Sequence, residues 1–403
     1  MRIENRVWVS SRFVLLAVFL AVVALVQLPA GDLHGQAQTK PEIITFDAPG
    51  AGTGPYQGTE PIEINPEGAI TGFYFDSNNV AHGFLRKPYG KFITFDAPGA
   101  GSANVTGLVG TPAYIYGGQG TYAISINPAG AITGFYVDKD DVWHGFLRHP
   151  DGKFITINVE GAGTGAGQGT EATTIDPAGV IQGNYITADG VYHVFVRDPG
   201  GRITKVDVPN AGTGAGQGTL ISWALYDPTG AIAGEYIDAN GAAHGFVRAS
   251  GGKITEFDVP GAVGTYSWAI NTRGMVTATY IDANYLAHGY LRAPNGKFTY
   301  VDATNTATAA YAGTWPEDIN DAGTIVGNYY NDDLVNHAFI WTPDGKFTYF
   351  EVPGAGTGAY QGTTPLTNNP AGAITGLYID NGNVSHGFLR LEGPRWSQSW
   401  WNR

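Results

Sequence analysis

A histidine motif recurs along this chain at nearly regular intervals. In each copy an aromatic residue follows the histidine by two positions, a tyrosine precedes it by eight, and an asparagine or aspartate precedes it by 17. Successive copies are 44 to 62 residues apart, and the motif histidines are His82, His144, His193, His244, His288, His337 and His386. A repeat of about 50 residues that holds four short strand patterns is typical of a β-propeller, in which each copy forms one blade.

The copy over residues 60–96 shows the strand pattern of one blade. Strands are expected over residues 60–65, 69–75, 80–86 and 91–96, where β-branched and aromatic residues gather. Turn sequences such as Asn65-Pro66-Glu67-Gly68 separate them, since proline presets φ and glycine accepts a left-handed conformation. The longest connector follows the fourth strand and leads into the next copy. The first strand of each copy is therefore expected to be the innermost strand of its blade.

The two ends of the repeat complement each other. A fourth-strand pattern at Ile43–Asp47 precedes the first complete copy, and the last copy ends at Arg390 without a fourth strand. These features predict one all-β domain over residues 43–390, a seven-bladed β-propeller closed by an N-terminal strand that completes the last blade. Closure of this kind removes exposed sheet edges. A flat solenoid is the alternative, but it would need distinct caps at its ends.

The third strand of each copy carries a sequence that resembles a known family. Val80-Ala81-His82-Gly83-Phe84-Leu85-Arg86 and His337-Ala338-Phe339, preceded by Ile-Asn-x-x-Gly-x-Ile-x-Gly, resemble the bacterial HAF family of extracellular repeat proteins. The resemblance covers about residues 43–390, and single copies depart from it at Val194, Ala278 and Trp341. It implies export and a propeller-like fold. It implies no reaction, because a shared fold does not transfer one.

The N-terminal segment has the features of a signal peptide. Arg2, Arg6 and Arg12 precede an apolar run over residues 13–28, which is short for a membrane span, and small residues follow it. We expect residues 1–37 to be removed on export to the periplasm or the cell exterior, leaving no membrane span. A retained N-terminal anchor is the alternative.

Composition narrows the classes of partner. The net charge is −13, which opposes binding to nucleic acid and to anionic lipid. The absence of cysteine rules out a disulfide or a lipidated cysteine. We expect a monomer whose Trp-rich tail, residues 391–403, folds back over a blade; left exposed, the tail would be an adhesive patch.

The repeated histidines do not predict a catalytic or metal site. Catalysis needs one asymmetric constellation, whereas every copy carries this residue, so we expect each imidazole to be hydrogen-bonded to the motif tyrosine or to the Asn/Asp 17 residues before it, as a structural lock. No cofactor is predicted. Acid-rich turns such as residues 138–141 leave a weak possibility of Ca²⁺, although none has the spacing of a twelve-residue calcium loop.

Departures from the repeat mark the candidate ligand site. The connector over residues 101–120 is the longest and carries Tyr114 and Tyr116, and the residue near the start of the innermost strand varies between blades. The varying residues are Glu60, Tyr122, Glu171, Ser222, Tyr266, Trp315 and Thr364. Aromatic rings and carboxylates around a channel mouth are suited to a sugar or another small polar molecule, although they can also simply pack there.

The chain is therefore predicted to be a non-enzymatic binding or interaction module for a small molecule, a glycan or a protein. The alternative is an extracellular lyase or hydrolase with its site at the channel mouth. Convergence of Glu60, Glu171 and Glu317 on one pocket would favour the enzyme. Glu317 and Asp318 are adjacent on a strand and point to opposite faces, so they do not form an acid–base pair.

Overall fold

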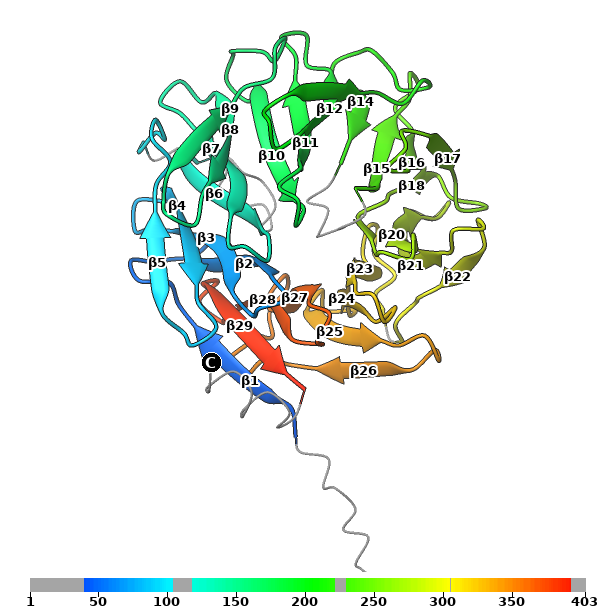
Figure 1. The fold of residues 1–403 in the computed structure, drawn as a ribbon. Coiled ribbons are helices and arrows are strands. Elements are labelled where there is room, and N and C mark those ends of the chain that lie inside the picture. The colour runs from blue at the N-terminus through cyan, green and yellow to red at the C-terminus, as the bar shows by residue number, and fades with distance from the viewer. Residues whose placement is uncertain (1–39, 104–117, 222–229, 305, 393–403) are drawn as a thin grey trace, which may run out of the picture. The chain divides into compact units, whose positions relative to one another are not determined.

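Antiparallel meanders of short strands follow one another along the chain and lie side by side around a centre (Figure 1). The computed structural model describes residues 40–103, 118–221, 230–304 and 306–392, and every regular element in these residues is a strand. They belong to one compact unit, Lys40–Arg403. In Figure 1 the first strands β2, β23 and β27 lie near the centre, and the last strands β5 and β26 lie at the rim.

The strands form the following successive groups. The first three groups are β2 (Gly58–Ile64), β3 (Ile70–Phe75), β4 (Ala81–Arg86) and β5 (Phe92–Phe95); β6 (Gly120–Ile126), β7 (Ile132–Val137), β8 (Trp143–Arg148) and β9 (Phe154–Ile157); and β10 (Gly169–Ile175), β11 (Ile181–Ile186), β12 (Tyr192–Arg197) and β13 (Ile203–Val206). Two more are β14 (Gly218–Leu220), β15 (Ile232–Ile237), β16 (Ala243–Arg248) and β17 (Ile254–Phe257); and β18 (Gly264–Thr265), β19 (Ala269–Ile270), β20 (Val276–Ile281), β21 (Ala287–Arg292) and β22 (Phe298–Tyr300). The last two are β23 (Thr314–Ile319), β24 (Ile325–Tyr330), β25 (Asn336–Trp341) and β26 (Phe347–Phe350); and β27 (Gly362–Asn368), β28 (Ile374–Ile379), β29 (Ser385–Leu391) and β1 (Glu42–Phe46).

The strands β2 to β5 overlap the four strands predicted for residues 60–96. The turn after β2 is closed by a hydrogen bond that the Gly68 amide donates to the Asn65 carbonyl at 2.9 Å, with Gly68 at φ +81°. This left-handed conformation carries no steric cost for glycine. The predicted turn chemistry is therefore confirmed at this position.

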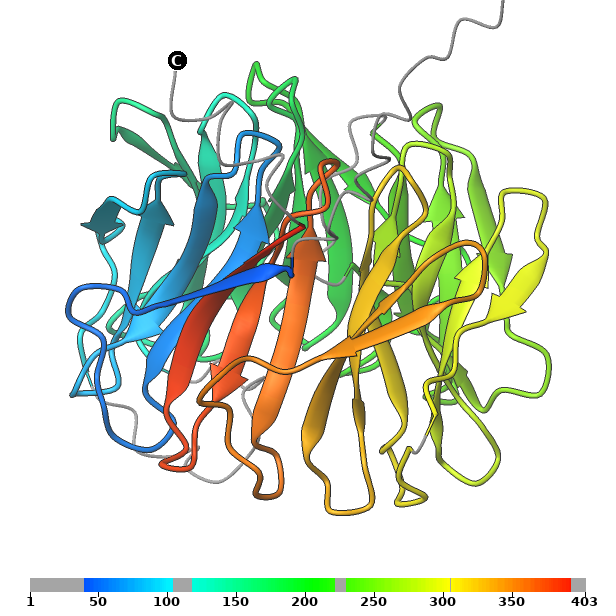
Figure 2. The ribbon, with the colours of Figure 1, turned by 90° about the horizontal axis from the view of Figure 1, so that it is seen from below.

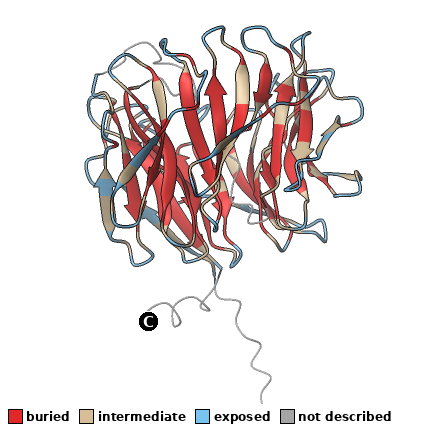
Figure 3. Ribbon diagram, turned by 45° about the horizontal axis from the view of Figure 1, so that its top comes forward, coloured by how far each residue is buried: buried red, intermediate tan, exposed pale blue. Residues whose placement is uncertain are grey.

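The core lies between neighbouring groups of strands. Figure 3 shows the strand interiors as buried, and in Figure 2 the strands run from one end of the unit to the other. The aromatic residue two positions after each motif histidine is completely buried: Phe84, Phe146, Phe195, Phe246, Tyr290, Phe339 and Phe388. The repeated motif thus supplies one large core side chain to every group.

The connectors that lead from one group of strands to the next lie at the same end of the strands as the turns between the second and third strands of each group. We call this end the connector face. The Gly52 amide in the connector before β2 donates to the Phe75 carbonyl at 2.8 Å, and the Gln57 side-chain amide donates to Asn79 Oδ1 at 2.9 Å. The same backbone bond joins Gly163 to Ile186. These contacts place the connectors and the turns at the same face.

The first and last strands of the unit meet as predicted. β1 pairs with β29 in antiparallel register, with Ile43 opposite Arg390, and β2 contacts the other side of β29 through Gly58 and Ser385. The Arg86 guanidinium of β4 stacks over the Phe46 ring of β1, 4.7 Å from its centroid. Pairing of Ile43–Asp47 with the third strand of the last group is thus confirmed.

Candidate functional site

The seven motif histidines lie near the connector face, and each has an equivalent set of neighbours in its own group of strands. The Nδ1 of each histidine lies 2.6–3.3 Å from a side-chain oxygen at the end of a fourth strand. These partners are Asp96, Asn158, Asp207, Asp258, Asp302, Glu351 and, for His386, Asp47. The imidazole also stacks on the motif tyrosine, with ring centroids 4.9–5.2 Å apart.

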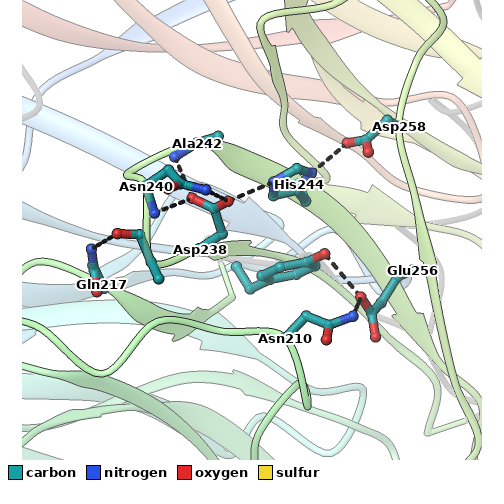
Figure 4. A network of polar contacts seen from close by, with 10 residues as sticks. Asn210, Gln217, Asp238, Asn240, Ala242, His244, Glu256 and Asp258 are labelled. Atoms are coloured by element: carbon teal, nitrogen blue, oxygen red, sulfur yellow. Dashed lines mark hydrogen bonds and ion pairs between the residues drawn. The ribbon is translucent and has the colours of Figure 1, made fainter.

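A carboxylate approaches the other ring nitrogen, Nε2, in five copies. Figure 4 shows His244 between Asp238 of the second-to-third-strand turn and Asp258. The five turn carboxylates lie 3.0–3.7 Å from Nε2 and belong to Asp76, Asp138, Asp238, Asp282 and Asp380. The hydrogen bonds to Asp96 and Asp47 raise the pKa values of His82 and His386.

Neither predicted hydrogen-bond partner is observed, because the motif tyrosine stacks on the imidazole and the Asn/Asp 17 residues before the histidine lies elsewhere. Asn65 lies at the far end of β2, where its amide donates to the Asn127 carbonyl at 3.1 Å and its Oδ1 accepts from the Ala69 amide. The antiparallel pairing of β3 with β4 sets Tyr74 opposite His82 and leaves Asn65 at the other end of the group. A signal for the true partner exists, because an Asp, Asn or Glu follows each of the first six histidines by 14 residues.

Tyr122 is a core residue, so its predicted role in ligand stacking is wrong. Its side chain is completely buried, and its hydroxyl donates to the Gly118 carbonyl at 2.7 Å. Its ring stacks on Phe135 at 4.8 Å and meets the edge of Phe73 at 5.0 Å. Aromatic neighbours on two groups of strands enclose this tyrosine, so no ring face is left for a ligand.

Glu60 and Glu171 are buried acids on separate inner strands. They are 6% and 9% exposed, and desolvation raises their pKa values to about 8 and about 7. The Asn184 amide donates to Glu171 at 3.4 Å. No hydrogen bond or ion pair joins either acid to the other or to Glu317 within the described part of the chain. These three acids therefore make no direct contact with one another.

Glu235 is a half-buried acid that was not predicted from the sequence. It faces Leu220 across the β14–β15 pair, and burial raises its pKa to about 7. Its Oε2 is buried without a hydrogen-bond partner. This pairing places Leu220 at the variable position in β14, and the predicted Ser222 lies outside the described residues. An acid inside an otherwise apolar strand pattern was the available signal.

Tyr266 and Trp315 lie together with a residue that was not predicted. The Trp268 and Trp315 rings stack with centroids 5.4 Å apart and planes at 18°, and Tyr266 lies 6.4 Å from Trp268. All three side chains are half-buried, and Trp315 Nε1 is buried without a hydrogen-bond partner. We call Tyr266, Trp268 and Trp315 the aromatic cluster. Trp268 follows Tyr266 by two residues, the spacing that places side chains on one strand face.

A carboxyl group with a raised pKa lies close to Trp315 in the sequence. Glu317, two residues after Trp315 on β23, has its pKa raised to about 8 by desolvation and by Asp318. Burial and Glu317 raise the pKa of Tyr330 to about 12. Asp318 contacts the next group of strands, where its Oδ2 accepts a hydrogen bond from the Asn368 backbone amide at 2.8 Å. The two acids nevertheless interact electrostatically, and the register shift between Pro316 and Asp318 interrupts the strict alternation of faces that the prediction assumed.

One pocket lies at the opposite ends of the inner strands. It is lined by Glu63, Ile64, Pro66, Asn271, Asp318, Ile319, Asn320, Asp321, Thr367, Asn368, Asn369 and Pro370. Glu63 Oε2 accepts the Ile126 amide at 2.7 Å, and Thr367 Oγ1 accepts the Ile64 amide at 3.2 Å. These side chains hold neighbouring inner strands together, so we assign the pocket to the framework.

The remaining expectations concern the loop, metals and the membrane. Tyr114 and Tyr116 lie outside the described residues. Among residues 40–103, 118–221, 230–304 and 306–392, no group of three or more His, Asp or Glu side chains is placed to hold a metal ion. The same residues contain no helix with the length and apolarity to cross a membrane.

Comparison with known proteins identifies the fold. No protein-family model matches the chain. No curated protein matches it either. A streptogramin B lyase structure has a TM-score of 0.50 at 12% identity, covering 88% of this chain and 99% of that chain. The BP39L lectin from Burkholderia pseudomallei has a TM-score of 0.53 at 10% identity, covering 83% and 95%. This is a propeller-type fold.

A puromycin hydrolase structure also matches, with a TM-score of 0.50 at 12% identity, covering 85% of this chain and 52% of that chain. A lyase, a lectin and a hydrolase thus share the propeller-type fold. At such low identity the likeness extends to the fold alone, and function has to be argued from the site.

Proposed function

We propose that residues 43–390 form a seven-bladed propeller of the HAF type, closed by β1 and exported after removal of residues 1–37. The pairing of β1 with β29 and the contact of β2 with β29 support closure. The Ile64 amide bond to Thr367 and the Asn369 amide bond to the Asn65 carbonyl also join the last blade to the first. Blades one to seven are numbered below from β2 onward.

We further propose that the propeller is a non-enzymatic binding module with its ligand site at the mouth of the connector face. The observation that carries this proposal is the aromatic cluster of blades five and six. Its partly exposed rings provide a stacking surface, which suits a sugar or another polar molecule with an apolar face.

The proposal is tested by measuring binding to the wild-type protein and the Trp315→Ala variant. A glycan array followed by calorimetry on the best binders is expected to give a dissociation constant that rises at least about tenfold in Trp315→Ala. Tyr89→Ala is the matched control, because Tyr89 is an exposed aromatic in a third-to-fourth-strand turn, away from the cluster. Equal binding by wild type and Trp315→Ala would reject the site, and turnover of a bound substrate would favour the lyase or hydrolase alternative.

A further inference from the structure

Four exposed tyrosines on the connector face have an unusual backbone conformation. Tyr56, Tyr311 and Tyr360 occupy the same connector position before blades one, six and seven, and Tyr285 lies in the second-to-third-strand turn of blade five. Their φ angles are +61° to +64°, and their side chains are 49–55% exposed. We call these four residues the tyrosine arc. A left-handed conformation is a true outlier for a bulky residue.

Other blades fill the same connector position with glycine. The amides of Tyr311 and Tyr360 donate to the carbonyls of Tyr285 and Leu334, which lie in the turn of the preceding blade. The amides of Gly167 and Gly216 make the matching bonds to Asp141 and Gly190, at φ +72° and +77°. The backbone at these seams between blades is therefore the same whether tyrosine or glycine is present.

Packing does not explain the choice of tyrosine. A Cβ built on Gly167 or Gly216 meets no atom within 4 Å, so the position faces open space. Tyrosine there fills no core and adopts a conformation that glycine adopts without strain. Strain that no packing requires points to a surface role for the side chain.

The tyrosine arc and the aromatic cluster share the seam between blades five and six, where Tyr311 precedes Trp315 by four residues. The Tyr285 and Tyr311 rings lie 6.0 Å apart at this seam, and at the next seam Tyr360 lies 6.2 Å from the half-buried Tyr330. Tyrosines of the arc thus lie at three consecutive seams, which join blades five to six, six to seven and seven to one.

We propose that the tyrosine arc binds a chain-like neutral carbohydrate that extends outward from the mouth of the propeller. This proposal rests on the proposed binding function and names its ligand class. Repeated aromatic platforms match the repeated apolar faces of sugar rings. Exposed polar side chains beside the rings, among them Asn284, Asp332 and Asn381, can hydrogen-bond sugar hydroxyls. The net charge of −13 disfavours an anionic polymer.

The test is affinity electrophoresis and calorimetry with soluble neutral polysaccharides: dextran, galactomannan, arabinoxylan and hydroxyethylcellulose, with anionic alginate as a separate arm. The triple variant Tyr56→Gly, Tyr311→Gly and Tyr360→Gly is expected to raise the dissociation constant for the bound neutral polymer at least about tenfold. Its melting temperature should not fall, since other seams already use glycine. The gain variant Gly167→Tyr with Gly216→Tyr adds two platforms and is expected to bind more tightly.

Three results would overturn the tyrosine arc: no neutral polysaccharide binds, alginate binds more tightly than the neutral polymers, or the triple variant binds as the wild type does. If the triple variant binds normally and Trp315→Ala does not, the arc fails while the mouth site stands. If neither substitution changes binding, both proposals fail. If the triple variant has a lowered melting temperature, its binding is not informative, and the variant with Gly167→Tyr and Gly216→Tyr is used instead. An affinity of this variant equal to that of the wild type contradicts the proposal.

Discussion

The imidazole of His386, in the last strand of the unit, lies 2.9 Å from the carboxylate of Asp47, which directly follows its first strand. The two residues are 339 positions apart in the sequence. The same contact joins His82 to Asp96 within the first blade, at 2.8 Å. In a blade made from one continuous segment, the histidine contact therefore joins two neighbouring strands of that segment. In the last blade the same contact joins the two ends of the chain.

Removal of residues 41–50 is expected to lower the melting temperature by at least about 5 °C, because a loss of 1 kcal/mol corresponds to about 2–4 °C in domains of 150–250 residues. The deletion removes β1 and leaves β29 with an open edge. Differential scanning calorimetry measures the effect. Phe46→Ala, which removes the ring beside Gly387 and Arg86, should show a smaller decrease of the same sign. An unchanged melting temperature in the deletion variant contradicts closure.

The contact between His386 and Asp47 is expected to stabilise the protein less at alkaline pH. The hydrogen bond to Asp47 raises the pKa of His386 in the folded state, so its contribution is full below pH of about 6.5 and is lost as the pH rises through the folded value. Asp47→Asn should remove this part of the pH dependence of the free energy of unfolding. Urea titrations at pH 6 and pH 9 compare the two proteins. An identical difference between the two pH values in wild type and Asp47→Asn would rule out the contribution.

Buried glutamates are also expected to make the protein less stable as the pH rises. Desolvation raises the pKa of Glu60 from 4.5 to about 8, so the neutral form is stable in the fold and stability falls as the pH rises from 4.5 through 8. The loss amounts to at most about 5 kcal/mol, because one pKa unit corresponds to about 1.4 kcal/mol. Glu60→Gln should flatten the decrease in the free energy of unfolding between pH 5 and pH 9. Lys139, which is fully exposed, offers a matched control as Lys139→Gln; an equal effect from both substitutions would contradict the account.

Gly58 should tolerate no side chain at the contact between the first and last blades. A Cβ there would lie 2.0 Å from the Ser385 carbonyl oxygen, and φ is +117°. Gly58→Ala is expected to lower the free energy of unfolding by about 3 kcal/mol. Gly241→Ala is the control that measures the cost of the left-handed backbone conformation without a steric clash. Its φ is +85°, and a Cβ built on Gly241 meets no atom within 4 Å. The control should cost about 1–2 kcal/mol. Equal losses in the two variants would show that the contact itself adds nothing.

Much of the fold follows from local sequence signals. Short strand patterns, turn residues and the spare strand at residues 43–47 predict the meanders and the pairing of β1 with β29, since strand propensity and turn chemistry are local. The histidine partner was missed because it depends on sheet register. Asp96 reaches His82 only when β4 and β5 pair with Gly83 opposite Phe95.

The candidate site was less predictable than the fold. Tyr122 and Trp315 share one position in the repeat, yet Tyr122 is enclosed by Phe73 and Phe135 whereas Trp315 stacks on the half-exposed Trp268. The neighbouring blade sets each environment, and a single copy of the repeat carries no information about it. The tyrosine arc depends on φ angles, which the sequence alone does not give at exposed positions.

A structure of the protein bound to an oligosaccharide of the best-bound polysaccharide tests the central claim most directly. The account predicts sugar rings on the connector face, one in contact with Trp315 at the mouth and the next beside Tyr311. An oligosaccharide bound instead in the pocket at the opposite ends of the inner strands, or on the outer strands at the rim, would contradict it.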